Sequence, residues 1–503
     1  MEGRVMRRAM QRQRNAPEAA ATHVRGLHSI SSRPYDTIAP ADTERVVDAA
    51  LTLLAEIGLR FEPGTEADAL LAQAGCTVLP DGVVRMPAVV VRRALATVAK
   101  AVQLWNRDGT RAIDIDAHHT WFMPGMTCIK VFDEATGEPR DSTRADLATI
   151  SRIADGLDNI DAVCVACKDV PESTLRGEIG EFLCMMEHTT KPLEYLCEWT
   201  RSLEAAIEMA AALRGGHDRL AEMPYFLHIV TPLPLYYAET HVEQVILAAR
   251  AGVPLSVGSL AIGGASTPIT TAGTVVQCLA TDFAGMVLGQ AAREGSFCIG
   301  STNPYFMEPA TGGIGNMPQT MLAEQLICQA RRHLGLPSLT GIGGEARARR
   351  FGQDAVFEIA TLMGQFFHTR PATCDYLGSL DQGITYSLHA LLLCDDYAGM
   401  LRTLWTGTEV SDDTLALDLL REVGLTGTVL GHEHTARHCR KNLWASRYFA
   451  GNEPVSSSDK PDETLFQRID RDLRQRLSAP GPEPLPAGLL ARLRMIHEAH
   501  ATP

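Results

Sequence analysis

From about residue 160 onward, the sequence alternates short apolar runs with stretches of helical periodicity. The strand-like runs are DAVCVACKD (161–169), LEYLCEW (193–199), YFLHIVTP (225–232), LSVGSLAIG (255–263), FCIGSTNP (297–304), SLTGIGG (338–344) and TCDYLGSL (373–380). Each is followed by a helical stretch of about ten to twenty residues. Nearly continuous apolar runs are typical of parallel strands that helices cover on both faces. The repetition therefore restricts the chain to an α/β fold.

Two architectures alternate strands and helices in this way. The seven runs, with an eighth strand supplied by the segment from Trp121 to Phe132, predict a (β/α)8 TIM barrel. The alternative is an open, doubly wound sheet, in which Gly-x-Gly-x-x-Gly opens the first helix or a Walker sequence is present. Neither sequence occurs in this chain, so we predict the barrel.

The segments before and after this repetition have different patterns. Residues 1–40 are rich in arginine and almost free of large apolar residues, so we expect a disordered basic arm rather than a transit peptide. Residues 41–118 mix helical and strand patterns and predict an N-terminal helical/β cap. The barrel is expected at 119–410, and a C-terminal helical extension at 411–503. Helical extensions at both ends favour a homo-oligomer.

Composition excludes several classes of function. The net charge of −14 argues against nucleic acid as a partner, because a phosphate-binding surface needs an excess of basic residues. The sequence contains no run of about eighteen uncharged apolar residues, so it predicts no membrane span. The twelve cysteines lie mostly in apolar segments, as buried thiols do in a reducing compartment. We therefore expect a cytoplasmic protein with no membrane contact.

Two groups of residues resemble metal ligands but do not predict a metal site. Cys164 and Cys167 form a Cys-x-x-Cys pair, yet residues three apart on a strand point to opposite faces, and no second pair completes a zinc set. His432, His434 and His438 are spaced like ligands, but the basic residues Arg437, Arg440 and Lys441 surround them. We interpret these histidines as structural, or as part of a basic patch facing an acidic partner.

In a barrel, functional side chains come from the carboxyl ends of the strands and the loops that follow them. The candidates for substrate binding at these positions are Asp169, Glu198, His228, Ser301, Asn303, Tyr305, Glu345, Asp375 and Tyr376. They include no Ser-His-Asp order and no Schiff-base lysine, so they are suited to holding a ligand rather than attacking it. For His228, which lies inside an apolar strand, a buried structural role is the alternative.

A loop of small residues joins the run at 255–263 to a long apolar helix. Its residues Gly264, Ala265, Ser266, Thr267, Pro268, Ile269, Thr270, Thr271, Ala272 and Gly273 resemble a signature of the trimethylamine methyltransferase family, which commonly reads Gly-Ala-Thr-Ala-Pro-Val-Thr-x-Ala-Gly. The resemblance implies that the loop at Gly264, Ser266, Thr267 and Pro268 lies near the substrate or near the corrinoid cofactor that accepts a methyl group in this family.

Further matches extend the resemblance over roughly residues 42–450. The stretch 131–161 is similar to the family pattern through Asp133, Gly137, Arg140, Asp146, Arg152, Asp155, Asn159 and Ile160. The segment 413–424 resembles a family helix, and His434-Thr435 matches its His-Thr dipeptide. The family fold is a (β/α)8 barrel, which agrees with the strand pattern.

The resemblance implies a reaction. Family members move a methyl group from a methylated amine to the Co(I) of a corrinoid that a separate small protein carries. It thus implies two partners, a small quaternary or methylated amine and a corrinoid protein, and no metal bound directly by this chain. For a quaternary ammonium, the site is expected to offer aromatic rings and carboxylates that surround the cation.

The chain departs from the family pattern in ways that bear on the substrate. Members specific for trimethylamine carry pyrrolysine near the end of the sixth strand, whereas 341–358 holds only ordinary residues. The members without pyrrolysine act on quaternary amines such as glycine betaine, so a betaine-like substrate is expected. Its carboxylate could pair with Arg347, Arg349 or Arg350, which could equally face solvent. The family's Asn-Ala-Glu is Ala280-Thr281-Asp282 here.

Two other functions fit the same barrel. One is a non-catalytic homologue that binds a quaternary amine and transfers no methyl group. The other is a metal-dependent lyase or hydrolase, which would need metal ligands at the strand ends.

Overall fold

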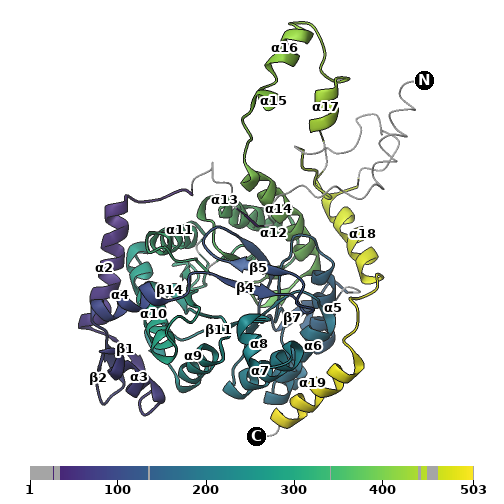
Figure 1. Ribbon diagram of the computed structural model, residues 1–503. Helices are drawn as coiled ribbons and strands as arrows, with labels where there is room; N and C mark the ends of the chain where they lie inside the picture. The colour runs from purple at the N-terminus through teal and green to yellow at the C-terminus, as the bar shows by residue number, and fades with distance from the viewer. Residues whose placement is uncertain are drawn as a thin grey trace.

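The computed structural model describes residues 26–27, 34–133, 136–315, 317–339, 341–439, 443–449 and 463–501. Its centre is a set of parallel strands surrounded by helices (Figure 1). The strands are β6 (Trp121–Pro124), β9 (Val163–Cys164), β10 (Leu193–Leu196), β11 (Phe226–Val230), β13 (Leu255–Val257), β15 (Cys298–Gly300) and β17 (Thr373–Leu377). The α/β class expected from the strand–helix repetition is confirmed.

The strands follow one another in chain order. A five-stranded parallel sheet has the order β15-β13-β11-β10-β9, and β6 pairs in parallel with β17. β6 also lies beside β9, since the Asp161 amide donates to the Phe122 carbonyl at 2.8 Å. On the other side of β17, Ile342 forms a parallel bridge with Asp375. This order lacks the reversal that defines a doubly wound sheet.

In the part of the chain that the structure describes, eight long helices surround these strands. They are α5 (Arg144–Asp155), α6 (Leu175–His188), α7 (Thr200–Arg214), α9 (Glu239–Ala251), α10 (Thr271–Ala292), α11 (Met317–His333), α12 (Gln353–Gly364) and α14 (Leu388–Thr406). Shorter turns are η1 (Val170–Glu172), α8 (His217–Glu222) and α13 (Phe366–Thr369). Among the described residues, α10 alone is long and apolar enough to cross a membrane, but 78% of its most apolar window is buried inside the protein. Contacts with α2 (Pro40–Glu56), α4 (Ala88–Thr97), α9 and α11 account for that composition.

Alternation along the strands separates an inner from an outer set of side chains. On β10, Tyr195 faces the helices and packs against Phe182 of α6, with ring centroids 4.8 Å apart. Its partner in the strand register is His228 of β11, which therefore also faces outward. The neighbours Glu194 and Ile229 consequently face inward.

Several runs predicted as single strands are broken at their carboxyl ends. The run 255–263 divides into β13 and β14 (Leu260–Gly263), and 297–304 divides into β15 and β16 (Asn303–Phe306). The break is at Gly258, where an added Cβ would lie 2.2 Å from the Ser301 carbonyl carbon. Glycine at this position thus allows the backbone at 258 to approach the backbone at 301 closely. The run 338–344 has only the bridge at Ile342 among its described residues.

Other short strands also lie beyond the carboxyl ends. They are β7 (Lys130–Phe132), β8 (Pro139–Asp141), β18 (Ser379–Leu380) and β19 (Thr385–Tyr386), which form one sheet in the order β18-β19-β7-β8.

The N-terminal residues cover the opposite end and one side of the strands. The hairpin of β4 (Val102–Trp105) and β5 (Ala112–Ile115) lies across the strands in Figure 1. It lies at their amino ends, because the Trp105 amide donates to the carbonyl of Pro224, just before β11. The other N-terminal elements are α2 (Pro40–Glu56), α3 (Glu66–Ala74), α4 (Ala88–Thr97), β1 (Leu59–Phe61), β2 (Thr77–Val78) and β3 (Val83–Arg85). The three strands form a sheet with β12 (Tyr236–Tyr237), which follows β11 in the chain. The predicted basic arm lies mostly outside the described residues.

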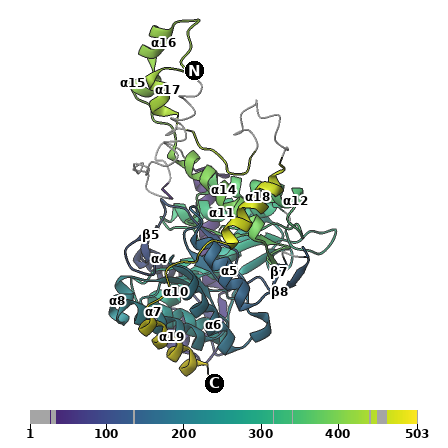
Figure 2. The same cartoon turned by 90° about the vertical axis from the view of Figure 1, so that its right-hand side faces the viewer.

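After α14 the chain forms an arm and then returns to the body. The arm consists of α15 (Asp412–Leu415), α16 (Leu417–Val423) and α17 (Glu433–His438), and it projects away from the other helices (Figures 1 and 2). The single helix suggested by DTLALDLLREVG is interrupted at Ala416, whose φ is +53°. The last helices are α18 (Leu465–Leu477), beside α14, and α19 (Ala487–His500), which packs against α6 and α7.

A buried ion pair joins α10 to α11 behind the strands. Arg331 donates to Asp282 at 2.5 Å, and both side chains are at most 2% exposed. Thr302 also donates to Asp282, and Arg331 donates to Ser338 at 2.9 Å. Burial nevertheless raises the pKa of Asp282. Asp282, where the chain departs from the family pattern, thus has an ion-pair partner on the next helix.

Breaking this pair should destabilise the protein strongly. In Arg331→Met, Asp282 would keep a buried charge without its cation, which costs about 3–5 kcal/mol. The double variant Asp282→Asn/Arg331→Met removes both charges and should recover most of that loss. Chemical denaturation of the two variants and the wild type checks this. Equal destabilisation of the single and the double variant would contradict it.

Candidate functional site

A cavity of about 250 Å³ lies at the carboxyl ends of the parallel strands. We call it the strand-end cavity. Its lining comes from several strands and their loops: Met126, Thr127, Glu194, Leu196, Glu198, Ile229, Thr231, Ser256, Gly258, Ser259, Leu260, Ser301, Asn303, Leu339, Asp375 and Tyr376. Thr231, Leu260 and Glu198 are exposed, whereas Glu194, Ser256 and Asp375 are buried. The cavity is therefore closed at its base and open to solvent at its rim.

Two carboxylates occupy the buried part of the cavity. Glu194 on β10 is 3% exposed and Asp375 on β17 is 5% exposed; we call them the acidic pair. Glu194 Oε2 and Asp375 Oδ1 have no hydrogen-bond partner among the described residues. Burial raises the pKa of Asp375 to about 7. Burial, together with the charge of Asp375, raises the pKa of Glu194 well above its usual value.

The strand that carries Asp375 is irregular at the cavity. The register between β17 and β6 shifts between Cys374 and Leu377, as in a β-bulge. Tyr376 within the bulge has a φ of +65°, a strained conformation for a bulky residue. The bulge directs Tyr376 into the cavity lining, where its hydroxyl accepts from Asn303 Nδ2 at 3.4 Å. Bulges often re-aim side chains beside active sites.

The structure brings five of the nine candidate binding residues together. Glu198, Ser301, Asn303, Asp375 and Tyr376 all line the strand-end cavity. Two buried hydroxyls of the lining, Ser256 and Ser259, had not been predicted, and Ser259 Oγ has no partner among the described residues. Among the described lining residues, Tyr376 is the one aromatic. Of the aromatic rings and carboxylates that were expected around a cation, this lining therefore offers mainly carboxylates.

Tyr305 and Glu345 lie beside this cavity rather than in its lining. The Tyr305 hydroxyl donates to Glu345 Oε2 at 2.7 Å, and both residues border a second cavity of only about 30 Å³. Burial raises the pKa of Glu345 to about 7. Burial, together with the charge of Glu345, raises the pKa of Tyr376.

Asp169 and His228 have protein partners outside the cavity lining. Asp169 pairs with Arg144 at 2.9 Å. His228 is fully buried, with Nδ1 at 3.1 Å from the Tyr195 carbonyl and Nε2 at 3.2 Å from Gln244 Oε1. Burial lowers the pKa of His228 to about 4, so the ring is neutral at physiological pH. These contacts match the buried structural role that was the alternative for His228.

The loop at Gly264, Ser266, Thr267 and Pro268 forms a tight turn at the start of α10. Ser266 Oγ accepts from the Ile262 amide at 2.9 Å, and Thr274 Oγ1 donates to the Pro268 carbonyl at 2.6 Å. Gly264 has a φ of +91°, which favours glycine. None of these four residues belongs to the cavity lining.

The three arginines considered for a substrate carboxylate do not line the strand-end cavity either. Arg347 borders the 30 Å³ cavity. The Arg349 side chain is 89% exposed, and Arg350 pairs with Glu138 at 2.6 Å on the surface.

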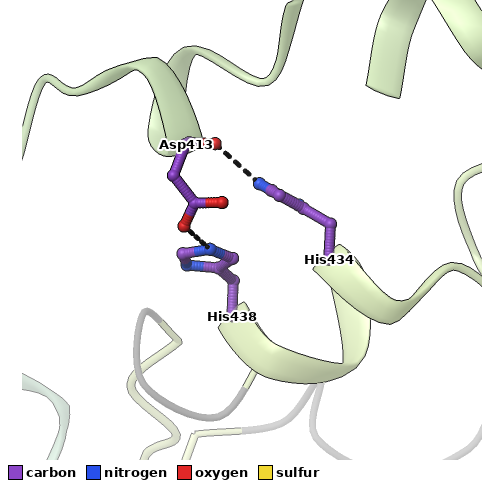
Figure 3. Close-up of side chains that lie close together, drawn as sticks. All are labelled: Asp413, His434 and His438. Atoms are coloured by element: carbon purple, nitrogen blue, oxygen red, sulfur yellow. Dashed lines mark hydrogen bonds and ion pairs between the residues drawn. The ribbon is translucent and has the colours of Figure 1, made fainter. Parts of the chain in front are cut away.

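The histidine cluster lies in the arm, where Asp413, His434 and His438 approach one another (Figure 3). His434 Nε2 is 2.9 Å from the Asp413 carbonyl oxygen, and His438 Nε2 is 2.9 Å from Asp413 Oδ2. Arg437 donates to the other carboxylate oxygen, and His432 caps α17. These bonds hold α17 against α15. No other group of potential metal ligands is found among the described residues.

Comparison with known protein families assigns the chain to one of them. The family model described as trimethylamine methyltransferase (MTTB) matches residues 4–496. The chain belongs to the trimethylamine methyltransferase family. The resemblance expected from the loop at 264–273 is thereby confirmed.

Relatives in the family carry two kinds of name. Trimethylamine methyltransferase MttB of Desulfitobacterium hafniense (strain DSM 10664 / DCB-2) is 28% identical over 460 residues, covering 90% of this chain and 91% of the relative. Glycine betaine methyltransferase of Desulfitobacterium hafniense (strain Y51) is 23% identical over 418 residues, covering 82% of this chain and 86% of the relative. The names thus include both a tertiary and a quaternary amine.

A solved methyltransferase structure aligns with the chain over most of its length. The monomethylamine methyltransferase (MtmB) of Methanosarcina barkeri aligns with a TM-score of 0.46 and 11% identity, over 86% of this chain and 91% of that one. The family assignment rests on the sequence match, since this structural similarity is too weak to add to it.

The lining residue that the search of strand ends overlooked is Glu194. It lies within LEYL rather than after it, so a search of strand ends selects Glu198 instead. A signal was nevertheless present. A carboxylate in an otherwise apolar strand must face a polar interior or a partner, because its burial is costly.

The acidic pair should reduce stability as pH rises. Asp375 has a raised pKa of about 7 when folded and about 3.9 when unfolded, so the folded state binds more protons between these values. Stability should therefore fall as pH rises from about 4 to about 7. Between pH 5 and pH 8, the difference in stability between Asp375→Asn and the wild type should shift in favour of the variant by about 1–3 kcal/mol, because an amide cannot ionise.

Denaturation of the wild type and Asp375→Asn at pH 5 and pH 8 measures this difference. The exposed Asp218→Asn on α8 is the matched control, and its difference in stability from the wild type should be the same at both pH values. A constant difference between Asp375→Asn and the wild type at both pH values would contradict the role of the buried carboxylate.

Proposed function

We propose that this protein is a corrinoid-dependent methyltransferase that takes a methyl group from a quaternary or other methylated amine. The observation that carries the proposal is the acidic pair at the base of a small strand-end cavity, in a chain of the trimethylamine methyltransferase family. Buried carboxylates that each have an oxygen without a partner among the described residues suit a cationic ligand.

The proposed reaction requires the protein mainly to bind and orient its substrate. The acceptor is the Co(I) of a corrinoid carried by a separate protein, a strong nucleophile that forms the bond to the methyl carbon. The electrons of the broken N–C bond remain on nitrogen, so a quaternary ammonium leaves as a neutral tertiary amine and needs no proton. Glu194 and Asp375 would hold the cation, while the narrow cavity orients its methyl groups toward the rim.

The rim would receive the partner. Leu260 is 49% exposed there, next to the exposed Thr231 and Glu198. An apolar residue at the mouth suits a protein that must cover the opening while the methyl group is transferred and water is excluded. Because the acceptor approaches from outside, the opening at the carboxyl ends of the strands is the entry for both substrates.

The proposal includes the architecture and setting expected from the sequence. The parallel strands would close into a (β/α)8 barrel through the segment 338–344, between β15 and β17. The units would be the cap at 41–118, the barrel at 119–410 and the extension at 411–503. A cytoplasmic homo-oligomer remains the expected state.

Methyl transfer to reduced free cobalamin tests the function. With purified full-length protein and a methylated amine, the Co(I) absorbance should disappear as methyl-Co(III) forms. Asp375→Asn should lower kcat/KM about 10- to 100-fold, since a hydrogen bond or ion pair to a charged group contributes about 1.5–3 kcal/mol. Asp218→Asn is the control and should retain wild-type activity.

The outcomes separate the alternatives. Amine binding without methyl transfer to free cobalamin or to a corrinoid protein would favour the non-catalytic homologue. A metal-dependent lyase or hydrolase requires ligands at the strand ends, and the one candidate group among the described residues lies in the arm. Stoichiometric metal in the purified protein, lost on Asp375→Asn, would nevertheless support that class.

A further inference from the structure

We propose that the strand-end cavity selects a quaternary ammonium without a carboxylate, of the class of choline, and that Glu194 and Asp375 are its counter-charge. The inference deepens the proposed function, because it names the amine that the same site would take. It departs from the betaine-like substrate expected from the sequence.

The charge of the lining carries the argument. Glu194, Glu198 and Asp375 line the cavity, and none of its described lining residues is lysine, arginine or histidine. A betaine would bring one positive and one negative charge into this acidic cavity. Its ammonium group would be compensated, but its carboxylate would have no cation to pair with.

The short reach of a betaine makes this mismatch severe. In glycine betaine one methylene group separates the ammonium nitrogen from the carboxylate carbon. An ammonium held by the acidic pair would therefore keep the substrate carboxylate within a few ångströms of two like charges. Repulsion between like charges is strong in a buried site, where water screens it little.

The polar groups that remain suit a hydroxyl or a neutral substituent. Ser259 Oγ and Asn303 Oδ1 have no hydrogen-bond partner among the described residues. Ser256 is also buried in the lining, at 1% exposed. A hydroxyl can donate to the Asn303 carbonyl oxygen and accept from a serine, whereas a carboxylate can only accept. The hydroxyethyl arm of choline has this capacity.

The volume of the cavity restricts the size of the ligand. At about 250 Å³ it is smaller than the range of about 300–1,000 Å³ found for drug-sized ligands. A trimethylammonium group with a two-carbon arm is of suitable size.

The titratable groups that interact electrostatically with the acidic pair, among the described residues, are themselves acids. They are Cys164 on β9, Cys374 and Tyr376 on β17, and Glu324 on α11, in addition to Glu198 at the rim. Burial raises the pKa of Glu324 to about 8. The negative charge of the pair is thus not offset from these elements, and an incoming cation should replace protons held by the pair.

Isothermal titration of the purified full-length protein tests the selection with four compounds. They are choline, tetramethylammonium, glycine betaine, and 3,3-dimethyl-1-butanol, the uncharged carbon isostere of choline. Choline should bind at least about tenfold more tightly than glycine betaine, a difference of about 1.4 kcal/mol. The isostere should not bind measurably. Glycine betaine binding as tightly as choline, or no binding by any cation, would overturn the proposal.

Variants assign the effect to the acidic pair. Glu194→Gln and Asp375→Asn should each weaken choline binding at least about tenfold. The exposed Asp218→Asn should bind choline as the wild type does. Choline affinity should rise from pH 6 to pH 8.5 in the wild type, and less steeply in Glu194→Gln, because one titrating group is gone. Unchanged choline affinity in both pair variants would refute the assignment.

The methyl-transfer assay separates this inference from the proposed function. Methyl transfer from glycine betaine, with tight betaine binding, would leave the methyltransferase proposal standing and overturn the selection. Choline binding as expected, without methyl transfer to cobalamin or to any corrinoid protein, would leave the selection standing and overturn the methyltransferase proposal.

Discussion

The alternation of side chains along the parallel strands is the constraint on which the rest of this structure depends. Each strand sends one set of residues outward to the helices and the other set inward. Tyr195 and His228 belong to the outer set, and Glu194 and Ile229 to the inner one. Since parallel strands share one direction, their carboxyl ends meet at one face, where the inner residues of several strands line a single cavity.

At that cavity the fold tolerates an arrangement that lowers its own stability. Glu194 and Asp375 are buried together, and oxygens of both have no partner among the described residues. Tyr376 adds a strained backbone beside them. Another buried carboxylate, that of Asp282, differs from them because it has Arg331 and Thr302 as partners. The contrast supports the proposed role of the acidic pair in binding a ligand, whereas the Asp282–Arg331 pair joins α10 to α11.

Strand-end reasoning located much of the candidate site. Asp375, Tyr376, Ser301, Asn303 and Glu198 follow or end strands, and the structure places them around one cavity. It was less informative for residues within strands. Whether such a residue faces the helices or the interior depends on a register shift of one position, which apolar runs on both faces do not reveal. Glu194 was therefore overlooked, and His228 was included although its ring contacts Gln244 of α9.

By itself, the sequence determined the α/β class, the family and the presence of acidic residues near the strand ends, because apolar periodicity and local motifs are written in consecutive residues. The tertiary structure decided which of those residues meet. It joined Glu194 to Asp375, which is 181 positions further along the chain by their residue numbers, and placed the signature loop at 264–273 and the arginines at 347–350 outside the lining. Contacts between distant segments depend on strand order and register, and no local pattern specifies these.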